Sequence, residues 1–199
     1  MLPAFSLNKI NNNNHTPLKP PWRPATTLPP SRAPQNTSSL GVGLVGFGTR
    51  STCQSVTTSF QQTDGNVSVK ASVQLEKPDS QLLKAYLTIF SKTPSIDVII
   101  TLGSNGYSKS DIAPDVVGSL ISSKEAFALS TAVSHHVSSG GLPASRTVAG
   151  SNGQCLLLTL SDNVEGAVSV IARFEAIFRA ICDEIKGGSG HKTQQQHHI

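Results

Sequence analysis

Acidic side chains are missing from the first 63 positions of this 199-residue sequence, and long apolar runs are missing throughout. No segment approaches the roughly 20 consecutive apolar residues that a membrane-spanning helix needs. The first ten residues also lack an apolar run long enough for a secretory signal. We therefore expect a soluble protein with no membrane partner.

Proline is concentrated at one end, since eight of the twelve prolines lie between Pro3 and Pro34. Residues 1–40 are too polar and proline-rich to bury the apolar area that would offset their ordering entropy, and residues 188–199 have the same character. We predict a disordered N-terminal extension (1–40), one domain (41–187) and a disordered tail (188–199). The extension is either an ordinary disordered segment or an organelle transit peptide. The expected location is the cytoplasm in the first case and a plastid or mitochondrion in the second.

The net charge of +4 also comes from the ends of the chain. Between positions 41 and 187 there are eleven Lys or Arg and twelve Asp or Glu, a net charge of −1. A domain that is basic only through its tails gives no reason to expect nucleic-acid binding.

Cysteine is scarce, and its spacing predicts neither a disulfide framework nor a metal site. Cys53, Cys155 and Cys182 are an odd number without paired spacing, which is typical of buried, reduced thiols. His135 and His136 are adjacent, so on a helix they point about 100° apart and cannot face one metal.

Apolar patterning predicts strands that alternate with helices. The expected strands cover 42–47, 66–75, 96–102, 144–149 and 155–160, the last two joined by a turn at 151–153. The expected helices begin near Pro78, cover 125–138, and run from a cap at Asp162 to about Ile185. Such alternation is typical of an α/β fold with a mostly parallel sheet covered by helices on both faces, in which ligands bind at the carboxyl ends of the strands.

Two loops of this kind are candidates for a ligand site. The first contains Gly46 and Gly48 and resembles the dinucleotide fingerprint G-x-G-x-x-G. Its third glycine position is Ser51, however, and no acidic residue follows at the required distance of about 20 residues. A dinucleotide-binding module is therefore the weakest of the functional hypotheses.

The second loop runs from Thr101 to Asp115 and follows the most apolar strand. Gly103 and Gly106 permit a tight turn and close approach of a ligand to the backbone. Asp111 and Asp115 could hold Mg²⁺ together with phosphate oxygens. A solvated strand-to-helix loop, with Asp111 near a helix cap, explains the same residues equally well.

Three motifs in the second half of the chain resemble the molybdopterin adenylyltransferase family, the MogA/MoaB group that includes the G domain of gephyrin. The segment from Asp97, DVIITLGSNGYSKSDIAPDV, is similar to D-L-I-L-T-x-G-G-T-G followed by R-D-V-T-P-E-A. The segment from Ser145, SRTVAG, is similar to S-R-x-x-A-G, and the segment from Cys155, CLLLTLSDNV, to L-I-I-N-L-P-G-N-P. Order and spacing agree from about Asp97 to Gly187.

The resemblance implies a three-layer α/β fold, a homotrimer, and a role in molybdenum cofactor biosynthesis. Members bind molybdopterin and ATP with Mg²⁺, and they transfer an adenylyl group to molybdopterin. Asp111 stands at the family's essential aspartate, which implies a catalytic and metal-binding role. The residues implied in binding molybdopterin or nucleotide are Gly103, Ser104, Asn105, Gly106, Asp115, Ser145, Arg146 and Asn163.

The chain also departs from the family pattern at charged and glycine positions. Ser104 replaces a loop glycine, Ser110 replaces the arginine before the aspartate, and Asp162 adds a negative charge in place of a glycine. These departures favour a divergent member, so a catalytically silent protein with a binding or scaffold role is the alternative hypothesis.

Overall fold

The computed structural model of the chain describes residues 39–48, 51–62, 66–122, 126–141 and 145–187. The predicted extension lies outside these residues apart from its last two positions, and the predicted tail lies outside them entirely. In chain order the elements are β1 (Leu40–Phe47), α1 (Thr52–Gln61), β2 (Val67–Leu75), α2 (Ser80–Ser91), β3 (Val98–Leu102), α3 (Ala113–Leu120), α4 (Phe127–Ser139), β4 (Ala149–Ser151), β5 (Leu156–Leu160) and α5 (Val164–Gly187).

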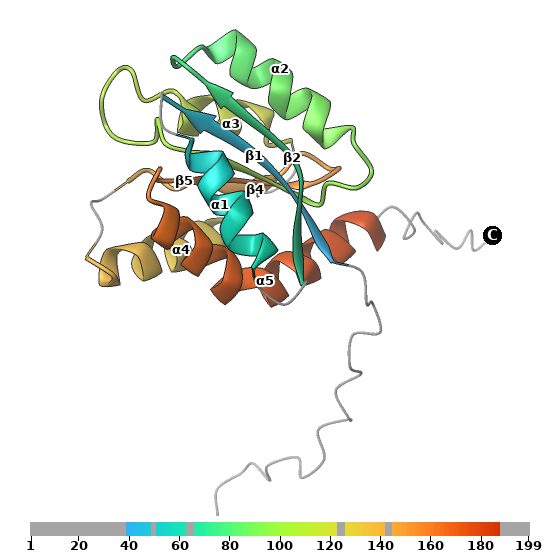
Figure 1. Ribbon diagram of the computed structural model, residues 1–199. Helices are drawn as coiled ribbons and strands as arrows, with labels where there is room; N and C mark the ends of the chain where they lie inside the picture. Colours follow the sequence, from blue (N-terminus) through green and yellow to red (C-terminus); the bar gives the residue numbers. More distant parts are fainter. Residues whose placement is uncertain (1–38, 49–50, 63–65, 123–125, 142–144, 188–199) are drawn as a thin grey trace, which may run out of the picture. The chain divides into compact units, whose positions relative to one another are not determined.

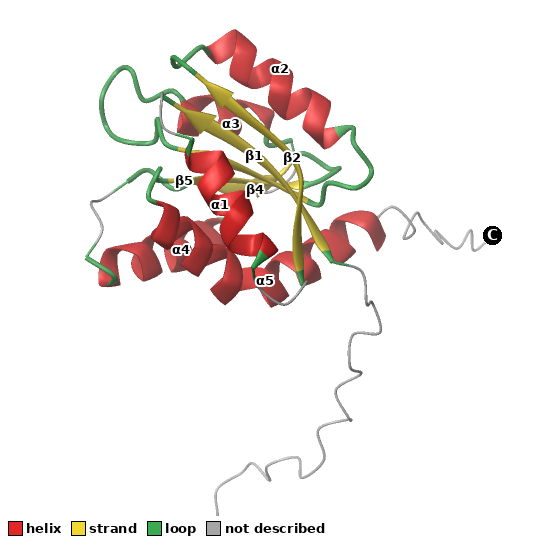
Figure 2. Cartoon of the chain, in the orientation of Figure 1, coloured by secondary structure: helices red, strands yellow, loops and turns green. Residues whose placement is uncertain are grey.

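The predicted three-layer α/β fold is confirmed. The five strands form one sheet in the order β2-β1-β3-β5-β4, in which every pairing is parallel except that between β4 and β5. Helices α2 and α3 cover one face, and α1, α4 and α5 cover the other (Figures 1 and 2).

The three central strands are buried on both faces, as their nearly continuous apolar runs predict. In β1, Val42 and Leu44 face the layer of α1, α4 and α5, whereas Val45 and Phe47 face α2 and α3. Every residue of β3 and β5 is buried. The parallel strands therefore end at one well-packed edge, and their carboxyl-terminal loops start from a rigid base.

Strand β2 differs from its predicted pattern. Alternation of apolar residues predicts that one face of this strand is apolar along its whole length, but the register shifts between Val42 and Gly43 of β1. Val69 pairs with Val42 and Ala71 pairs with Gly43, so the bulge leaves one residue of β2 over. Consequently the first half of β2 contributes to one core and the second half to the other.

Two helix caps show how local sequence sets the element boundaries. The Asp79 carboxylate accepts hydrogen bonds from the backbone N–H groups of Gln81 and Leu82, which begins α2 as expected. Helix α5 is capped differently from the prediction, because Asn163 Oδ1 accepts from the N–H of Gly166 at 2.6 Å. The predicted cap at Asp162 was therefore wrong by one residue.

The hairpin of β4 and β5 is also shorter than predicted, since β4 covers 149–151 instead of 144–149. At Val148 one bond of the ladder is still made by the backbone, because the N–H of Thr159 donates to the Val148 carbonyl at 2.9 Å. The N–H of Val148 instead donates to the Thr159 hydroxyl at 2.8 Å, so a side chain replaces the backbone partner and regular pairing ends there. The preceding residues from Ser145 are thereby free to reach the loop that follows β3.

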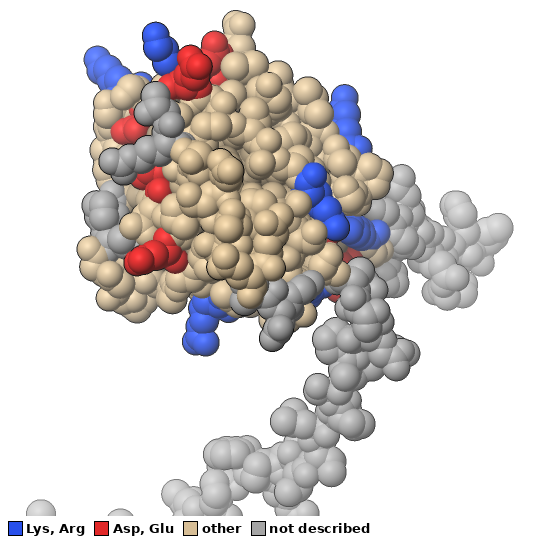
Figure 3. All heavy atoms as spheres, in the orientation of Figure 1, with Lys and Arg blue, Asp and Glu red and all other residues tan. Residues whose placement is uncertain are grey.

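Charged side chains are sparse on the visible face of the domain. On the face drawn in Figure 3, basic and acidic side chains lie in small separate groups with uncharged surface between them. Among the described residues, no helix is long and apolar enough to cross a membrane.

Candidate functional site at the carboxyl edge of the sheet

The loop from Gly103 to Ile112 begins in a left-handed turn. Gly103 has φ +90°, and a Cβ on it would lie 3.3 Å from Asp162 Cβ and 4.0 Å from Phe47 Cβ. Gly103 therefore lies where β1, β3 and β5 end together, and its lack of a side chain allows this close packing. The next residue, Ser104, also has a positive φ of +51°, which is uncommon for a residue with a side chain.

The Ser104 side chain makes hydrogen bonds that stabilise the left-handed turn. Its hydroxyl oxygen accepts from the N–H of Ile112 at 3.0 Å and donates to the carbonyl of Ser110 at 3.2 Å. Its carbonyl accepts from the N–H of Ala113, the first residue of α3, at 3.0 Å. The loop is therefore tied to the start of α3 by one residue.

Asp111 is held inside the same loop. Its Oδ2 atom accepts from the N–H of Ser108 at 2.8 Å, and its own N–H donates to the Ser108 carbonyl at 3.0 Å. A Cβ on Gly106 would lie 2.7 Å from this oxygen, so only glycine leaves room for the carboxylate there. The carboxylate thus has a structural role in the loop.

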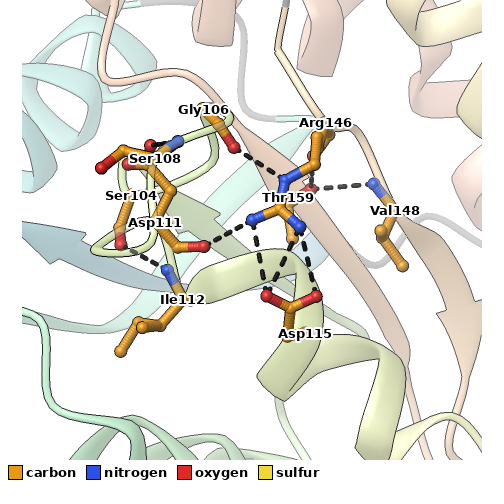
Figure 4. Close-up of polar contacts among 9 residues, drawn as sticks. All are labelled: Ser104, Gly106, Ser108, Asp111, Ile112, Asp115, Arg146, Val148 and Thr159. Carbon is orange, nitrogen blue, oxygen red and sulfur yellow. Dashed lines mark hydrogen bonds and ion pairs between the residues drawn. The ribbon is translucent and has the colours of Figure 1, made fainter.

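Arg146 brings the distant SRTVAG segment onto this loop (Figure 4). Its Nε atom donates to the carbonyl of Gly106 at 2.7 Å, and its Nη2 atom donates to the carbonyl of Asp111 at 2.5 Å. Its Nη1 atom lies 3.2 Å from Asp115 Oδ1. One guanidinium therefore clamps both ends of the 106–111 segment and also pairs with a carboxylate on α3.

The backbone of Arg146 is positioned from two sides. Its N–H donates to the carbonyl of Asn105 at 2.7 Å, and its carbonyl accepts from the Thr159 hydroxyl at 2.9 Å. Sequence reasoning missed Thr159, although a hydroxyl within the apolar strand LLLTL was a signal that a polar contact is required there. Strand β5 thereby positions Arg146, which in turn holds the loop.

The structure brings together most of the predicted site residues. Those in one hydrogen-bonded cluster are Ser104, Asn105, Gly106, Asp111, Asp115 and Arg146. Gly103 precedes this cluster in the chain, and its N–H donates to the carbonyl of Leu160 at the end of β5. Ser145 is half-buried beside Arg146 in the chain. Asn163 is the exception, because it caps α5 and lines a separate cavity of about 300 Å³ between α4 and α5. That cavity is also lined by His136, Glu165 and Ser169, which sequence reasoning did not assign to a site.

Buried polar atoms without a hydrogen-bond partner also gather at this edge. In the described part of the chain these atoms are Gln74 Oε1, Thr101 Oγ1, Asn105 Nδ2 and Thr147 Oγ1. Gln74 and Thr101 lie one residue before the ends of β2 and β3, Asn105 lies in the loop, and Thr147 follows Arg146. An unpaired buried polar group is costly, so such atoms mark places where a ligand or ordered water completes the structure.

The two carboxylates of this loop region already have partners within the chain. Among the described residues, no three His, Cys, Asp or Glu side chains are grouped to hold an ion. Asp111 has one oxygen on the Ser108 N–H, and Asp115 is paired with Arg146. Mg²⁺ in phosphate-binding sites commonly takes only one or two protein carboxylates, and substrate phosphates and water provide its other ligands.

The first glycine of the dinucleotide-like motif is closely surrounded by protein side chains. Gly46 lies inside β1, and a Cβ there would lie 2.4 Å from Gln74 Oε1 and 2.7 Å from Cys53 Sγ. Gln74 and Cys53 therefore leave no room for a side chain at position 46.

Comparison with known proteins supports the fold. No protein-family profile matches the sequence, and no curated protein matches it. Solved structures do match. The molybdopterin biosynthesis enzyme MoaB from Thermus thermophilus is 21% identical with a TM-score of 0.62, over 74% of this chain and 97% of that one. A molybdopterin biosynthesis protein from Mycobacterium abscessus is 17% identical with a TM-score of 0.64, over 75% of this chain and 98% of that one.

A third similar structure is the tungsten cofactor synthesizing protein MoaB from Pyrococcus furiosus, at 13% identity and a TM-score of 0.58, over 74% of this chain and 98% of that one. Identities this low establish a shared fold. The resemblance drawn from the motifs is confirmed at that level: the chain has the three-layer α/β fold of the MoaB proteins.

Proposed function

We propose that this chain is a divergent member of the molybdopterin adenylyltransferase family that acts in molybdenum cofactor biosynthesis. In this proposal it binds molybdopterin and Mg-ATP at the loop after β3 and transfers an adenylyl group to molybdopterin. The observation that carries the proposal is the gathering of unpaired buried polar atoms at the carboxyl edge, in and beside the motifs that resemble the family. Ligands of open α/β sheets bind at this edge.

The residues of the loop have separate tasks in this reaction. Gly103 and Gly106 carry no side chain, so ligand phosphates could approach the backbone closely. The Asn105 amide offers an unpaired N–H donor. Asp111 would hold the Mg²⁺ of ATP, and the ion would neutralise phosphate charge. In the transfer, a terminal phosphate oxygen of molybdopterin forms a bond to the α-phosphorus of ATP, and pyrophosphate leaves with the electrons of the broken P–O bond.

A catalytically silent binding protein is the second candidate, and the hydrogen bonding of the loop favours it. Ser104 Oγ already accepts the N–H of Ile112, and Asp111 Oδ2 already accepts the N–H of Ser108. Two amides are therefore saturated by the chain itself. A loop satisfied in this way would bind molybdopterin with less gain from phosphate contacts and with slow or no adenylyl transfer.

Calorimetric titration with molybdopterin and with Mg-ATP, followed by detection of adenylylated molybdopterin, tests both candidates. The decisive variant is Asp111→Asn, because asparagine still offers Oδ1 to the Ser108 N–H but is a poor ligand for Mg²⁺. Asp79→Asn is the matched control, since Asp79 also accepts backbone N–H groups but caps α2. We expect both variants to melt like the parent and only Asp111→Asn to lose Mg-ATP binding and turnover.

Three outcomes separate the alternatives. A parent protein that binds molybdopterin but forms no product supports the silent candidate. A parent that binds neither molybdopterin nor ATP refutes adenylyl transfer and leaves the silent alternative in its scaffold form. Turnover that survives in Asp111→Asn at the parent rate removes Asp111 from the mechanism.

Two further parts of the proposal concern assembly and location. We propose a homotrimer, in which exposed apolar side chains such as Ile89 and Phe127, 58% and 71% exposed in the single chain, would be partly covered. Sedimentation velocity at micromolar concentration measures this assembly. We also propose a cytoplasmic location, and a fluorescent fusion to the complete chain distinguishes it from a plastid or mitochondrion.

A further inference from the structure

The Arg146 guanidinium has two edges that differ in how strongly they are held. The Nε and Nη2 atoms bind the carbonyls of Gly106 and Asp111 at 2.7 and 2.5 Å. The contacts to Asp115 are longer, at 3.2 Å from Nη1 to Oδ1, 3.4 Å from Nη1 to Oδ2 and 3.4 Å from Nη2 to Oδ2. Charge-assisted bonds of this kind are usually about 2.7–2.9 Å, so the edge facing Asp115 is loosely paired.

Breaking the ion pair between Asp115 and Arg146 should cost little free energy. Its side chain is 75% exposed, whereas that of Arg146 is 29% exposed. Exposed ion pairs contribute little to stability because water screens them. Asp115 also lies in the first turn of α3, where the helix dipole favours a carboxylate whether or not the arginine is near.

From this asymmetry we propose that the Nη1 edge of Arg146 is a phosphate-binding contact and that Asp115 is an internal competitor for it. An anionic ligand group takes the place of the Asp115 carboxylate, while the Nε and Nη2 bonds continue to hold the loop. Figure 4 shows the geometry: the two carbonyls lie on one side of the guanidinium and the carboxylate on another. The inference rests on the proposed function only in expecting ligand phosphates at this edge, and it adds the residue that sets affinity for them.

Titration with inorganic pyrophosphate tests this directly, because that probe requires neither molybdopterin nor turnover. Asp115→Asn removes the competitor and keeps the size of the side chain, so we expect pyrophosphate to bind about two- to fivefold more tightly than to the parent, the range given by an exposed ion pair. Asp162→Asn is the matched control, since Asp162 is an exposed carboxylate at the same edge that packs against Gly103 instead of Arg146. Binding to this control should change less than binding to Asp115→Asn.

A second readout identifies the arginine itself. In ¹⁵N NMR spectra of Asp115→Asn, added pyrophosphate should shift the Arg146 side-chain resonances, while the backbone amides of the loop keep their dispersion. Equal affinities in Asp115→Asn and Asp162→Asn, weaker binding in Asp115→Asn, or no binding to any variant would overturn the inference. Tighter pyrophosphate binding in Asp115→Asn, in a parent that binds neither molybdopterin nor ATP, would support the inference while refuting the proposed function.

Discussion

Arg146→Lys is the substitution that most directly tests how the candidate site is held together. Arginine makes two charge-assisted hydrogen bonds to the carbonyls of Gly106 and Asp111, which lie five residues apart. Lysine is a point charge on a flexible stem, so it can satisfy at most one of these carbonyls in the same geometry. The variant keeps the positive charge, so any loss of stability is due to the loss of the planar guanidinium and its paired N–H donors.

The expected loss follows from the number and exposure of these bonds. A hydrogen bond to a charged group contributes about 1.5–3 kcal/mol, and a value in the lower half of this range applies here because Arg146 is partly exposed and water can reach the freed carbonyl. We expect the free energy of unfolding to fall by about 2 kcal/mol, which corresponds to a decrease in Tm of about 4–8 °C for a domain of this size. Asp115→Asn, which leaves both carbonyl contacts in place, should cost less than about 1 kcal/mol.

Urea unfolding measures the global loss, and amide hydrogen exchange locates it. The Asp111 N–H, which donates to the Ser108 carbonyl within the clamped segment, should exchange faster in Arg146→Lys than in Asp115→Asn. The amides of β1 should exchange faster only to the extent that the global free energy of unfolding is lower. If Arg146→Lys unfolds within about 0.5 kcal/mol of the parent, the usual range for a surface substitution, and the protection of Asp111 is unchanged, the clamp does not hold the loop and the description of the site is wrong.

Two other predictions concern the core. Phe178 is fully buried and stacks on Phe174 with ring centroids 6.3 Å apart, so Phe178→Ala should lower the free energy of unfolding in urea by about 3–5 kcal/mol. Ile177→Ala, on the exposed side of α5, is the control. Equal losses in the two variants would mean that the buried and exposed faces of α5 are misassigned. Burial raises the pKa of Cys53 from 9.0 to about 11 and the pKa values of Cys155 and Cys182 from 9.0 to about 12. Because the unfolded thiols release their protons near pH 9 and the folded thiols do not, their contribution to stability is complete below pH 9 and is lost as pH rises toward 12. The urea midpoint should fall over that range more steeply in the parent than in Cys155→Ala, and equal slopes would contradict this assignment.

Sequence patterning predicted the strands that are buried on both faces. The runs at β1, β3 and β5 are apolar on both faces, and a strand buried on both sides has no other common sequence pattern. Helix α1 was not predicted, because Thr and Ser dominate it and have low helix propensity. Its buried residues Cys53, Val56 and Phe60 do recur at helical spacing, so the signal was present but short.

The site was predicted in its members but not in its contacts. The motifs placed Asp111 and Arg146 in one site, and the structure brings them into contact across 35 positions of sequence. The resemblance implied that Arg146 lines a ligand pocket, and the geometry adds that its Nε and Nη2 atoms bind loop carbonyls. Spacing along a chain carries no information on which edge of a guanidinium is occupied, since that depends on how β5 and the 145–148 segment cross the loop.

Ser104 connects the altered motif to the question of activity. The family pattern has glycine at this position, and here a residue with a side chain holds φ +51° at a typical cost of about 1–2 kcal/mol. The two hydrogen bonds of its hydroxyl, to Ile112 and Ser110, are of the size needed to offset that cost. The left-handed turn is therefore maintained by a side chain in place of glycine, and the same side chain occupies an amide that a ligand could otherwise use. The Ser104 hydroxyl thus stabilises the shape of the loop, and it also takes up an N–H that could otherwise bind a phosphate. A loop of the right shape can therefore still bind phosphate weakly, so binding and turnover have to be measured separately in this protein.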